Sequence, residues 1–429
     1  MSQKKHENSA IGPGRVEEIT IDRLGAKGDG IADLTPPLYI PFAAPGDRLR
    51  VVLEGKRGDG RTGRISSILA AGTDRIEAPC RHFTACGGCA LQHLSPQSIG
   101  RFKRAVVKTA LRHRGIDDSC LGDTISVPDG SRRRAEFAVS KGTPLRIGLH
   151  RAGTKEIVDL EECPVVRPAI AALLPLLRDL LAKTDLARTI QDIRITETAT
   201  GMDLLFLSRK AEPPRAEVRQ TLAGFAEHSD IARLSWSGPN GSEPLVQRRR
   251  PEIRLGGARV ALPGQYFLQP SVEGEEAIAR IVCDAAGKAR RVADLYAGIG
   301  SLSFPLAEHA QTTAFELEAD MVAAMKSAAA GRSLTAETRD LARSPLMPVE
   351  LDRFDAVVFD PPRAGARQQA EYLAASAVPT VLAVSCNPTT LARDLRILID
   401  GGYTLQSVTP IDQFKWSAEV EAVAVLGKG

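Results

Sequence analysis

Two apolar segments near the end of the chain each lead into a residue that could take part in covalent chemistry. Residues 354–359 precede Asp360, and residues 381–384 precede Ser385 and Cys386. Apolar runs of this length predict buried strands, and open α/β sheets bind ligands beyond the carboxyl ends of their strands. A carboxylate and a thiol at two such strand ends favour nucleophilic catalysis by Cys386 over a purely structural cysteine.

A glycine-rich turn further upstream predicts a cofactor site. Residues 292–301 have the order strand, turn, helix, and Gly298 and Gly300 in the turn let a ligand approach the backbone. The third glycine of the dinucleotide-binding fingerprint is missing. Acidic side chains follow at three further loops: Glu316, Asp340 and Asp360. Carboxylates suit a cationic cofactor without phosphates, so S-adenosylmethionine is favoured over a dinucleotide, with ordinary loop acids as the alternative.

Four of the seven cysteines form a candidate metal site. Cys80, Cys86 and Cys89 lie within ten residues of one another, and Cys163 stands directly before a proline further along the chain. Four thiolates can hold an iron–sulfur cluster or a zinc ion. The gap between Cys80 and Cys86 exceeds the spacing of about two to four residues that is usual for paired zinc ligands. Because a proline after the last cysteine is typical of cluster-binding sequences, the cluster is favoured over zinc.

The composition predicts a soluble globular protein of about two or three domains. Of its 429 residues, 43% are hydrophobic and 25% are charged, which is ordinary for folded domains. No apolar run reaches the roughly 20 residues that a membrane helix needs, and the polar N-terminus is not a secretory signal. We therefore expect a cytoplasmic protein without a membrane partner. The odd number of cysteines argues against a disulfide framework.

Positive charge is concentrated in the first third of the chain. Residues 1–150 hold 24 Lys and Arg against 16 Asp and Glu, a balance of +8. The remaining residues hold 32 against 36, a balance of −4. Two arginine triplets, 132–134 and 248–250, add to the basic pattern. This asymmetry favours contact with the phosphates of a nucleic acid, with a solvated surface as the alternative for each cluster.

The order of the predicted elements divides the chain into four parts. Residues 1–14 are expected to be a disordered tail. Residues 15–72 contain short strands with Gly and Pro turns, typical of an OB-like β-barrel. Residues 73–265 form a central mixed α/β domain that includes the cysteine loop. Residues 266–429 alternate strands with helices, which predicts a doubly wound, Rossmann-like domain.

Two predictions within these parts concern individual elements. A helix is expected at residues 95–115, with an apolar stripe and otherwise basic positions, Lys103 among them, and it is a candidate to pack on the catalytic domain. The strands expected in the last part are 291–295, 312–316, 355–359, 380–384 and 420–426.

Taken together, these motifs resemble the RNA 5-methyluridine methyltransferases. The resemblance rests on the Ser-Cys-Asn-Pro sequence around Cys386, on the Asp-Pro-Pro-Arg sequence that begins at Asp360, and on the spacing of the clustered cysteines. It covers nearly the whole chain. The branch that modifies 23S ribosomal RNA, which carries a TRAM barrel and an iron–sulfur cluster, is the most similar.

The resemblance implies roles for individual residues of this chain. Cys386 would be the nucleophile that adds to carbon 6 of uracil, and Glu421 the base that removes the proton from carbon 5 after methyl transfer. The cofactor contacts, from the glycine-rich turn and the resemblance together, would be Gln269, Tyr296, Gly298, Gly300, Ser301, Glu316, Asp340 and Asp360. The ligands of a structural [4Fe-4S] cluster would be Cys80, Cys86, Cys89 and Cys163.

Four positions depart from the pattern of that family. The family usually has His two residues before the general base, Asn after the glutamine, Asn near the end of the cofactor loop, and Pro after a phenylalanine. The residues of this chain at those positions are Glu419, Pro270, Ser301 and Lys415. The changes leave Cys386 and Glu421 intact and bear on the pocket for the target base.

Three functions are consistent with the sequence. The first is an RNA uracil-C5 methyltransferase, acting on 23S ribosomal RNA rather than transfer RNA, as a monomer without an obligate protein partner. The second is a catalytically inactive RNA-binding iron–sulfur protein, because the region around Glu419 is altered. The third is an amino-group methyltransferase, but Arg363 stands where such enzymes place an aromatic residue. The first accounts for Cys386, Asp360 and Glu421 together.

Overall fold

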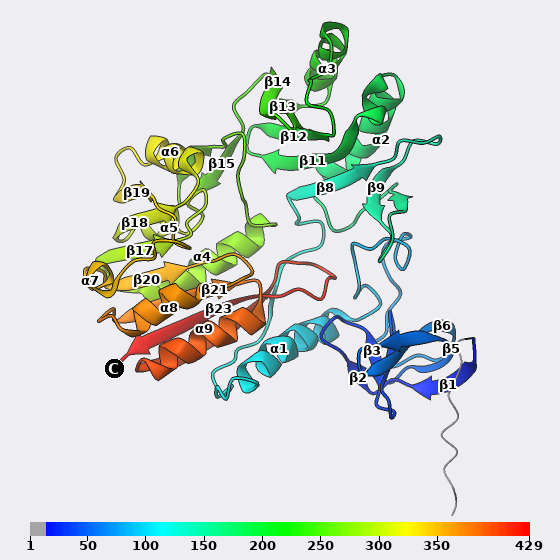
Figure 1. Cartoon of the computed structure of the whole chain (residues 1–429), viewed down its shortest axis with the longest axis horizontal. Coiled ribbons are helices and arrows are strands. Elements are labelled where there is room, and N and C mark those ends of the chain that lie inside the picture. The colour runs from blue at the N-terminus through cyan, green and yellow to red at the C-terminus, as the bar shows by residue number, and fades with distance from the viewer. Residues whose placement is uncertain (1–13) are drawn as a thin grey trace, which may run out of the picture. The chain divides into compact units, whose positions relative to one another are not determined.

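Residues 14–429 are described by a computed structural model, and their contacts divide them into two units (Figure 1). The first unit contains residues 14–84, 89–102 and 416–418, and the second contains residues 85–88, 103–415 and 419–429. The expected disordered tail, apart from Gly14, lies outside the described residues. The boundary between the units runs through the first long helix, α1 (Pro96–Arg112).

The first unit is built on a six-stranded sheet with the order β1-β5-β6-β4-β3-β2. Its strands are β1 (Val16–Thr20), β2 (Arg23–Leu24), β3 (Gly30–Ala32), β4 (Leu38–Ile40), β5 (Arg48–Arg57) and β6 (Gly60–Ala70). Leu49, Val51 and Leu53 alternate along β5 and are buried, as the two-residue period of a strand requires. The strands lie within the residues predicted to form an OB-like barrel, and assignment to the TRAM barrels stays a prediction.

A seven-stranded sheet forms the central domain of the second unit. Its order is β10-β9-β8-β11-β12-β13-β14; β12 and β13 are parallel, and the other neighbours are antiparallel. The strands are β8 (Arg134–Val139), β9 (Ile147–His150), β10 (Ile157–Asp159), β11 (Ile190–Thr198), β12 (Gly201–Ser208), β13 (Ile231–Gly238) and β14 (Gly241–Gln247).

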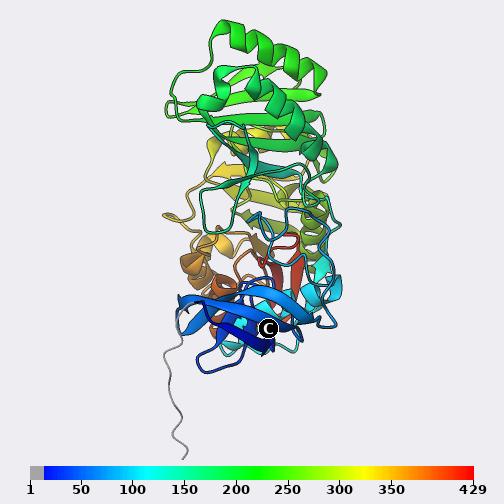
Figure 2. The same cartoon turned by 90° about the vertical axis from the view of Figure 1, so that its right-hand side faces the viewer.

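Two helices cover one face of this sheet, as Figures 1 and 2 show. They are α2 (Pro168–Ala182) and α3 (Ala216–His228), and a short 3₁₀ turn, η1 (Asp185–Arg188), follows α2. Leu174 of α2 and Leu222 of α3 pack with the strand residue Phe206 in one apolar core. Since strand side chains alternate between faces, the residues between the core positions point to the opposite, uncovered face.

The C-terminal domain contains an eight-stranded sheet with the order β19-β18-β17-β20-β21-β23-β22-β7. Its strands are β7 (Ile125–Ser126), β17 (Arg291–Leu295), β18 (Gln311–Glu316), β19 (Leu334–Thr338), β20 (Ala356–Phe359), β21 (Thr380–Ser385), β22 (Tyr403–Asp412) and β23 (Glu421–Lys428). The strands from β19 to β21 are parallel, and β23 is antiparallel to both of its neighbours. The predicted doubly wound α/β sheet is confirmed.

Helices cover both faces of the eight-stranded sheet (Figure 1). They are α4 (Val272–Ala286), α5 (Ser303–Leu306), α6 (Ala319–Ala328), α7 (Pro348–Leu351), α8 (Arg367–Ala374) and α9 (Pro388–Asp400). Alternate residues of β20 serve the two faces: Val357 packs with α8 and α9, whereas Val358 packs with α4. A hairpin of β15 (Glu252–Leu255) and β16 (Ala258–Ala261) packs against α6. None of the helices in residues 14–429 is long and apolar enough to span a membrane.

The second half of α1 packs on the C-terminal domain. Val107 and Leu111 belong to the same apolar core as α8 and α9. The sequence pattern groups Lys103 with the basic positions of this helix, but the structure buries it completely. Its Nζ pairs with the buried carboxylate of Asp412 in β22 and donates to the carbonyl of Phe414 at 3.0 Å. The ion pair explains the burial, because a buried charge requires a partner.

Candidate active site

A cavity of about 730 Å³ lies at the carboxyl ends of the parallel strands of the eight-stranded sheet. The cavity lies beside β17, where the strand order of the sheet changes direction from β17-β18-β19 on one side to β20-β21 on the other. Open α/β sheets bind ligands at such a point. Side chains from the uncovered face of the seven-stranded sheet complete the wall. Of the ten predicted catalytic and cofactor residues, nine line the cavity: Gln269, Tyr296, Gly298, Ser301, Glu316, Asp340, Asp360, Cys386 and Glu421.

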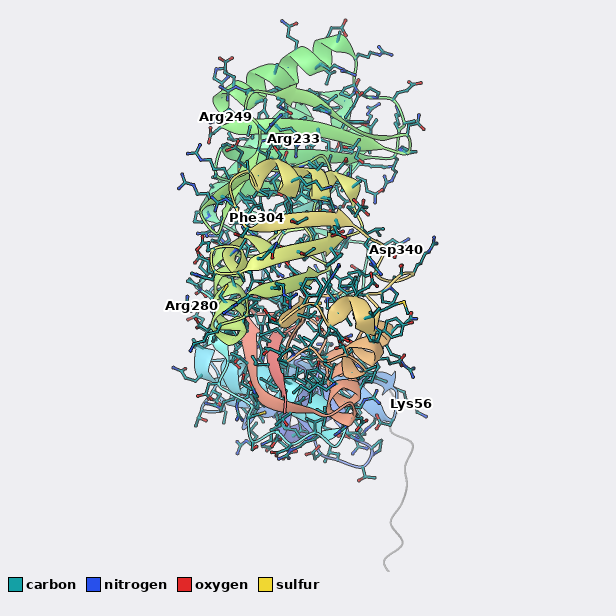
Figure 3. The ribbon with its side chains drawn as sticks, turned by 90° about the vertical axis from the view of Figure 1, so that its left-hand side faces the viewer. Lys56, Arg233, Arg249, Arg280, Phe304 and Asp340 are labelled. Carbon is teal, nitrogen blue, oxygen red and sulfur yellow. The ribbon has the colours of Figure 1, made fainter. Side chains whose placement is uncertain are left out.

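The turn after β17 brings backbone atoms to the cavity. Tyr296, Gly298 and Gly300 have positive φ angles of 63°, 57° and 93°. Glycine adopts this conformation freely, and a β-carbon at Gly300 would lie only 2.8 Å from the ring of Phe304. Gly300, the tenth predicted residue, therefore shapes the turn, although it does not line the cavity. Figure 3 labels Phe304 and Asp340, which both belong to the C-terminal domain.

Acidic residues lie at the ends of β18 and β19, as predicted. Glu316 accepts a hydrogen bond from the backbone nitrogen of Gly298 at 2.8 Å, and its second oxygen accepts from Leu317 and Glu318 at 2.8 and 3.0 Å. These bonds fix the carboxylate beside the glycine turn. Because each carboxylate oxygen can accept more than one bond, Glu316 retains acceptor capacity for hydroxyl groups of a ligand.

The junction of β21 and α9 presents the thiol of Cys386. Asn387 is the N-cap of α9: its side chain accepts from the backbone nitrogen of Thr389 at 3.1 Å. The Asn387 amide donates to the carbonyl of Arg363 at 3.0 Å, which ties this junction to the loop after β20. Pro388 occupies the first position of the helix, where its missing N–H costs nothing. The Cys-Asn-Pro sequence thus ends a strand and starts a helix at the cavity.

Glu421 reaches the same place because β23 runs antiparallel to β21. The first residue of β23 therefore lies at the sheet edge where β21 ends, and Ala422 pairs with Ser385. In the pairing of β22 with β23, Ile411 is opposite Glu421, and Phe414, two residues after β22, also lines the cavity. Glu421 is buried, and its Oε1 has no hydrogen-bond partner among the described residues.

Two glutamines connect the acidic residues of the cavity. Gln269 donates from Nε2 to Asp360 at 2.9 Å. Gln413 donates from Nε2 to Oε1 of Gln269 at 2.9 Å and to Oε2 of Glu421 at 2.8 Å. The chain of bonds runs from Asp360 to Glu421. Sequence reasoning missed Gln413, and its only signal was its place directly after a strand, 403–412, that was itself not predicted.

Burial shifts the proton affinities of these groups. It raises the pKa of Asp360 to about 7, and it raises the pKa of Glu421 well above its usual range, with a further contribution from the charge of Asp360. The pKa of the Cys386 thiol is raised first by burial and then by Glu421, while Arg363 acts in the opposite direction. At neutral pH the thiol therefore needs a base or a nearby cation to become a thiolate.

Part of the first arginine triplet supports the cavity instead of facing solvent. Arg133 is 4% exposed and pairs with the buried carboxylate of Glu275 at 2.8 Å. Ser301 donates to the same Glu275 oxygen at 2.6 Å. The prediction of phosphate contact is therefore wrong for Arg133, because a buried, paired guanidinium cannot reach RNA. Arg132 and Arg134 do line the cavity.

Several known proteins are similar to this chain over nearly its whole length. The chain is 39% identical over 422 residues to an RNA methyltransferase of Caulobacter vibrioides, covering 96% of this chain and 99% of that protein. It is 31% identical over 449 residues to the 23S rRNA (uracil(1939)-C(5))-methyltransferase RlmD of Halomonas elongata, covering 98% of this chain and 91% of that protein. Residues 260–428 match the family model of tRNA (Uracil-5-)-methyltransferase. This chain belongs to the RNA uracil-5 methyltransferases.

The fold of this RNA uracil-5 methyltransferase also has a solved counterpart. The tRNA (uracil-54, C5)-methyltransferase of Pyrococcus abyssi, in complex with S-adenosyl-L-homocysteine, superposes with a TM-score of 0.75 at 22% identity. The similarity covers 95% of this chain and 99% of that one. At this level of identity the comparison shows the α/β methyltransferase fold.

Two departures from the family pattern make local contacts in this methyltransferase. Glu419 forms an ion pair with Arg363 at 3.0 Å, and Arg363 also influences the thiol of Cys386. Lys415 pairs with Asp129 at 3.1 Å. Cys386 and Glu421 themselves both line the cavity.

The predicted cluster cysteines of this methyltransferase are divided between the units. Cys80 and Cys89 belong to the first unit, and Cys86 and Cys163 to the second, where both border the apolar core of the central domain. In residues 14–429, no group of three or more His, Cys, Asp or Glu side chains is arranged to hold a metal ion. The cluster therefore stays a prediction, and no reaction step is derived through it.

Proposed function

We propose that this RNA uracil-5 methyltransferase forms 5-methyluridine in 23S ribosomal RNA with S-adenosylmethionine as the methyl donor. The observation that carries the proposal is the meeting of Cys386 and Glu421 at one sheet edge, beside the glycine turn after β17. The 23S assignment is supported by the similarity to the Halomonas elongata enzyme. We expect the protein to act as a cytoplasmic monomer without an obligate protein partner.

The chemistry requires a nucleophile because carbon 5 of uracil does not attack a methyl donor by itself. The Cys386 thiolate adds to carbon 6 and forms a carbon–sulfur bond, which makes carbon 5 an enolate carbon. S-adenosylmethionine supplies the methyl group to carbon 5. Glu421 then accepts the carbon 5 proton through Oε1, and the carbon–sulfur bond breaks to release Cys386. The Asp360–Gln269–Gln413 chain holds the Glu421 carboxyl in place.

The residues around the glycine turn fit the proposed methyl donor. The donor carries a positive charge and no phosphate, and the cavity presents the carboxylates Glu316, Asp340 and Asp360. Tyr296, Gly298 and Ser301, from the turn after β17, also line the cavity, where they would contact the adenosine part. A dinucleotide would instead need donors for its phosphates, and the third glycine of the dinucleotide-binding fingerprint is missing here.

The direct test is Cys386→Ala with Cys283→Ala as the control. Cys283 is a half-buried thiol on α4 that does not line the cavity. We expect Cys386→Ala to abolish transfer of labelled methyl from S-adenosylmethionine to RNA, and Cys283→Ala to retain it. Mass mapping of 23S and transfer RNA from a deletion strain and its parent identifies the substrate. Retained transfer in Cys386→Ala would reject the mechanism, and a lost methyl group in transfer RNA would reject the ribosomal assignment.

We also infer a [4Fe-4S] cluster held by Cys80, Cys86, Cys89 and Cys163, with a structural role. It is supported by the cysteine spacing and by Pro164 after the last cysteine. Cys89→Ser should lower the iron and sulfide content of protein purified without oxygen and weaken folding, whereas Cys120→Ser should not. Zinc instead of iron in the parent protein, or equal iron in Cys89→Ser, would contradict the inference.

A further inference from the structure

A buried polar network joins the central domain to the chain segment that carries Gln269. Asp203 in β12 and Arg233 in β13 are partners in the parallel pair of these strands. Arg233 donates from Nε and Nη2 to the two oxygens of Asp203 at 2.9 and 2.7 Å, a bidentate ion pair. The side chain of Arg233 is only 9% exposed, and that of Asp203 only 7%. Figure 3 labels Arg233 in the central domain.

Strand alternation decides which way this pair points. Leu204 in β12 and Leu234 in β13 belong to the apolar core beneath α2 and α3. Asp203 and Arg233 precede these residues by one position, so they project from the opposite face, the one that contributes to the cavity. A bidentate pair on this face is costly to bury unless its remaining donors and acceptors are used.

Those remaining groups bind the segment that follows β16. Arg233 donates from Nη1 to the carbonyl of Leu262 at 3.1 Å and from Nη2 to that of Pro263 at 2.8 Å. The hydroxyl of Tyr266 donates to Oδ2 of Asp203 at 2.7 Å. Burial, together with the charge of Asp203, raises the pKa of Tyr266, so its hydroxyl keeps its proton and remains a donor.

The held segment ends at the cavity. Three residues after Tyr266, the side-chain amide of Gln269 makes two hydrogen bonds, one to Asp360 and one from Gln413. The backbone carbonyl of Gln269 accepts a hydrogen bond from Nε of Arg133 at 3.0 Å. The segment from Leu262 to Gln269 is therefore held by the central domain at its start, in its middle and at its end.

We propose that Asp203, Arg233 and Tyr266, here called the Tyr266 clamp, are positioning residues for methyl transfer. The clamp holds the Gln269 amide against Asp360 and Gln413, and through them orients Glu421. None of its three residues lines the cavity that holds Cys386 and Glu421. The inference rests on the proposed function, because it assigns the Gln269 chain a role in the reaction.

The alternative is that the clamp only stabilises the fold. A buried ion pair is weak support for that alternative, since replacing such a pair with apolar groups is often neutral for stability. The two roles differ in one respect. A positioning residue that acts through Gln269 loses its effect when the Gln269 amide is absent, whereas a stabilising residue does not.

The test is a double-mutant cycle between Tyr266→Phe and Gln269→Ala. Tyr266→Phe removes one hydroxyl and keeps the ring, 5.5 Å from the guanidinium of Arg134. We expect kcat to fall about five- to tenfold with the KM for RNA and the affinity for S-adenosylmethionine unchanged. In the Gln269→Ala background the same substitution should change kcat less than twofold. Tyr403→Phe, which removes another buried hydroxyl bonded at 2.7 Å to Val378, is the matched control.

Each other result overturns the inference. An equal loss of kcat in both backgrounds would make the clamp structural only, and unchanged kcat in Tyr266→Phe would show that the clamp is not needed. Full activity of Gln269→Ala would remove the residue through which the clamp acts. These results leave the proposed function intact as long as Cys386→Ala is inactive. Thermal unfolding of every variant shows whether the comparison is made on folded protein.

Discussion

At the scale of single residues, the groups around Cys386 shift the pKa of its thiol in opposite directions. Burial and Glu421 raise the pKa of the thiol, and Arg363 lowers it. The group that removes the carbon 5 proton thus also disfavours the thiolate that starts the reaction. Glu419 holds Arg363 at 3.0 Å, so a residue that departs from the family pattern takes part in this balance.

Glu421→Gln should separate the two chemical steps. RNA with 5-fluorouridine has no carbon 5 proton to lose, so its covalent adduct with Cys386 reports addition and methyl transfer alone. Glu421→Gln removes a carboxylate that raises the pKa of the Cys386 thiol. The rate of adduct formation should therefore reach its plateau at a lower pH than in the parent protein. Turnover on ordinary RNA should fall about 100-fold or more, as expected for loss of a general base.

The comparison variant is Glu371→Gln, at an exposed ion pair on α8. It should keep both the pH profile and the turnover of the parent protein. A Glu421→Gln variant with normal turnover and an unshifted profile would assign the base to another residue.

At the scale of elements, strand direction and one buried ion pair build the site. The antiparallel β23 brings its first residue to the edge where β21 ends. Its neighbour β22 delivers Gln413 to the same edge, and Asp412 at the end of β22 is held by Lys103 of α1. Burial lowers the pKa of Lys103 and raises that of Asp412, while their mutual attraction opposes both shifts.

Lys103→Met should therefore destabilise the protein strongly, because it leaves Asp412 buried without a partner. We expect a loss of about 3–5 kcal/mol in the free energy of unfolding, measured by denaturant titration. The double variant Lys103→Met with Asp412→Leu should recover most of this loss. Lys108→Met, which removes a more exposed cation 3.7 Å from Asp118, should cost at most about 1 kcal/mol. Equal losses for Lys103→Met and Lys108→Met would show that the buried pair has no special role.

At the scale of the whole molecule, the charge asymmetry concerns RNA binding. The balance of +8 in residues 1–150 includes Lys103 and Arg133, which are buried in ion pairs and cannot meet phosphates. Without these two residues, 22 Lys and Arg still outnumber the 16 Asp and Glu of residues 1–150. RNA is the substrate class of the family, so these cations are expected to contact its backbone.

Affinity for RNA should therefore decrease as salt increases. Between 50 and 200 mM salt we expect a loss of about tenfold or more, with a linear dependence of log K on log salt, measured by filter binding. The affinity for S-adenosylmethionine, which involves no phosphate, should change much less over the same range. A flat salt response of RNA binding would mean that the basic residues do not face the RNA.

Much of the site could be read from the chain because it depends on local sequence. Strand 291–295 was predicted at the bounds that the structure has, and the strand ends that carry Asp360 and Cys386 follow from apolar runs that stop at polar residues. The glycine turn is equally local, since glycine adopts positive φ angles such as those of Gly298 and Gly300 freely. The roles of Cys386 and Glu421 came from the family resemblance, and membership of the family is confirmed by the relatives.

Only the tertiary structure decided which of these residues meet. The direction of β23 and the place of β22 depend on pairing between distant segments, so the bond from Gln413 to Glu421 had no local signal. Burial of Lys103 and Arg133 likewise depends on partners 309 and 142 residues away in the chain. By itself the sequence determined the reactive groups and their strand ends, because propensity and turn chemistry are local. Their partners and proton affinities were decided by packing between distant parts of the chain.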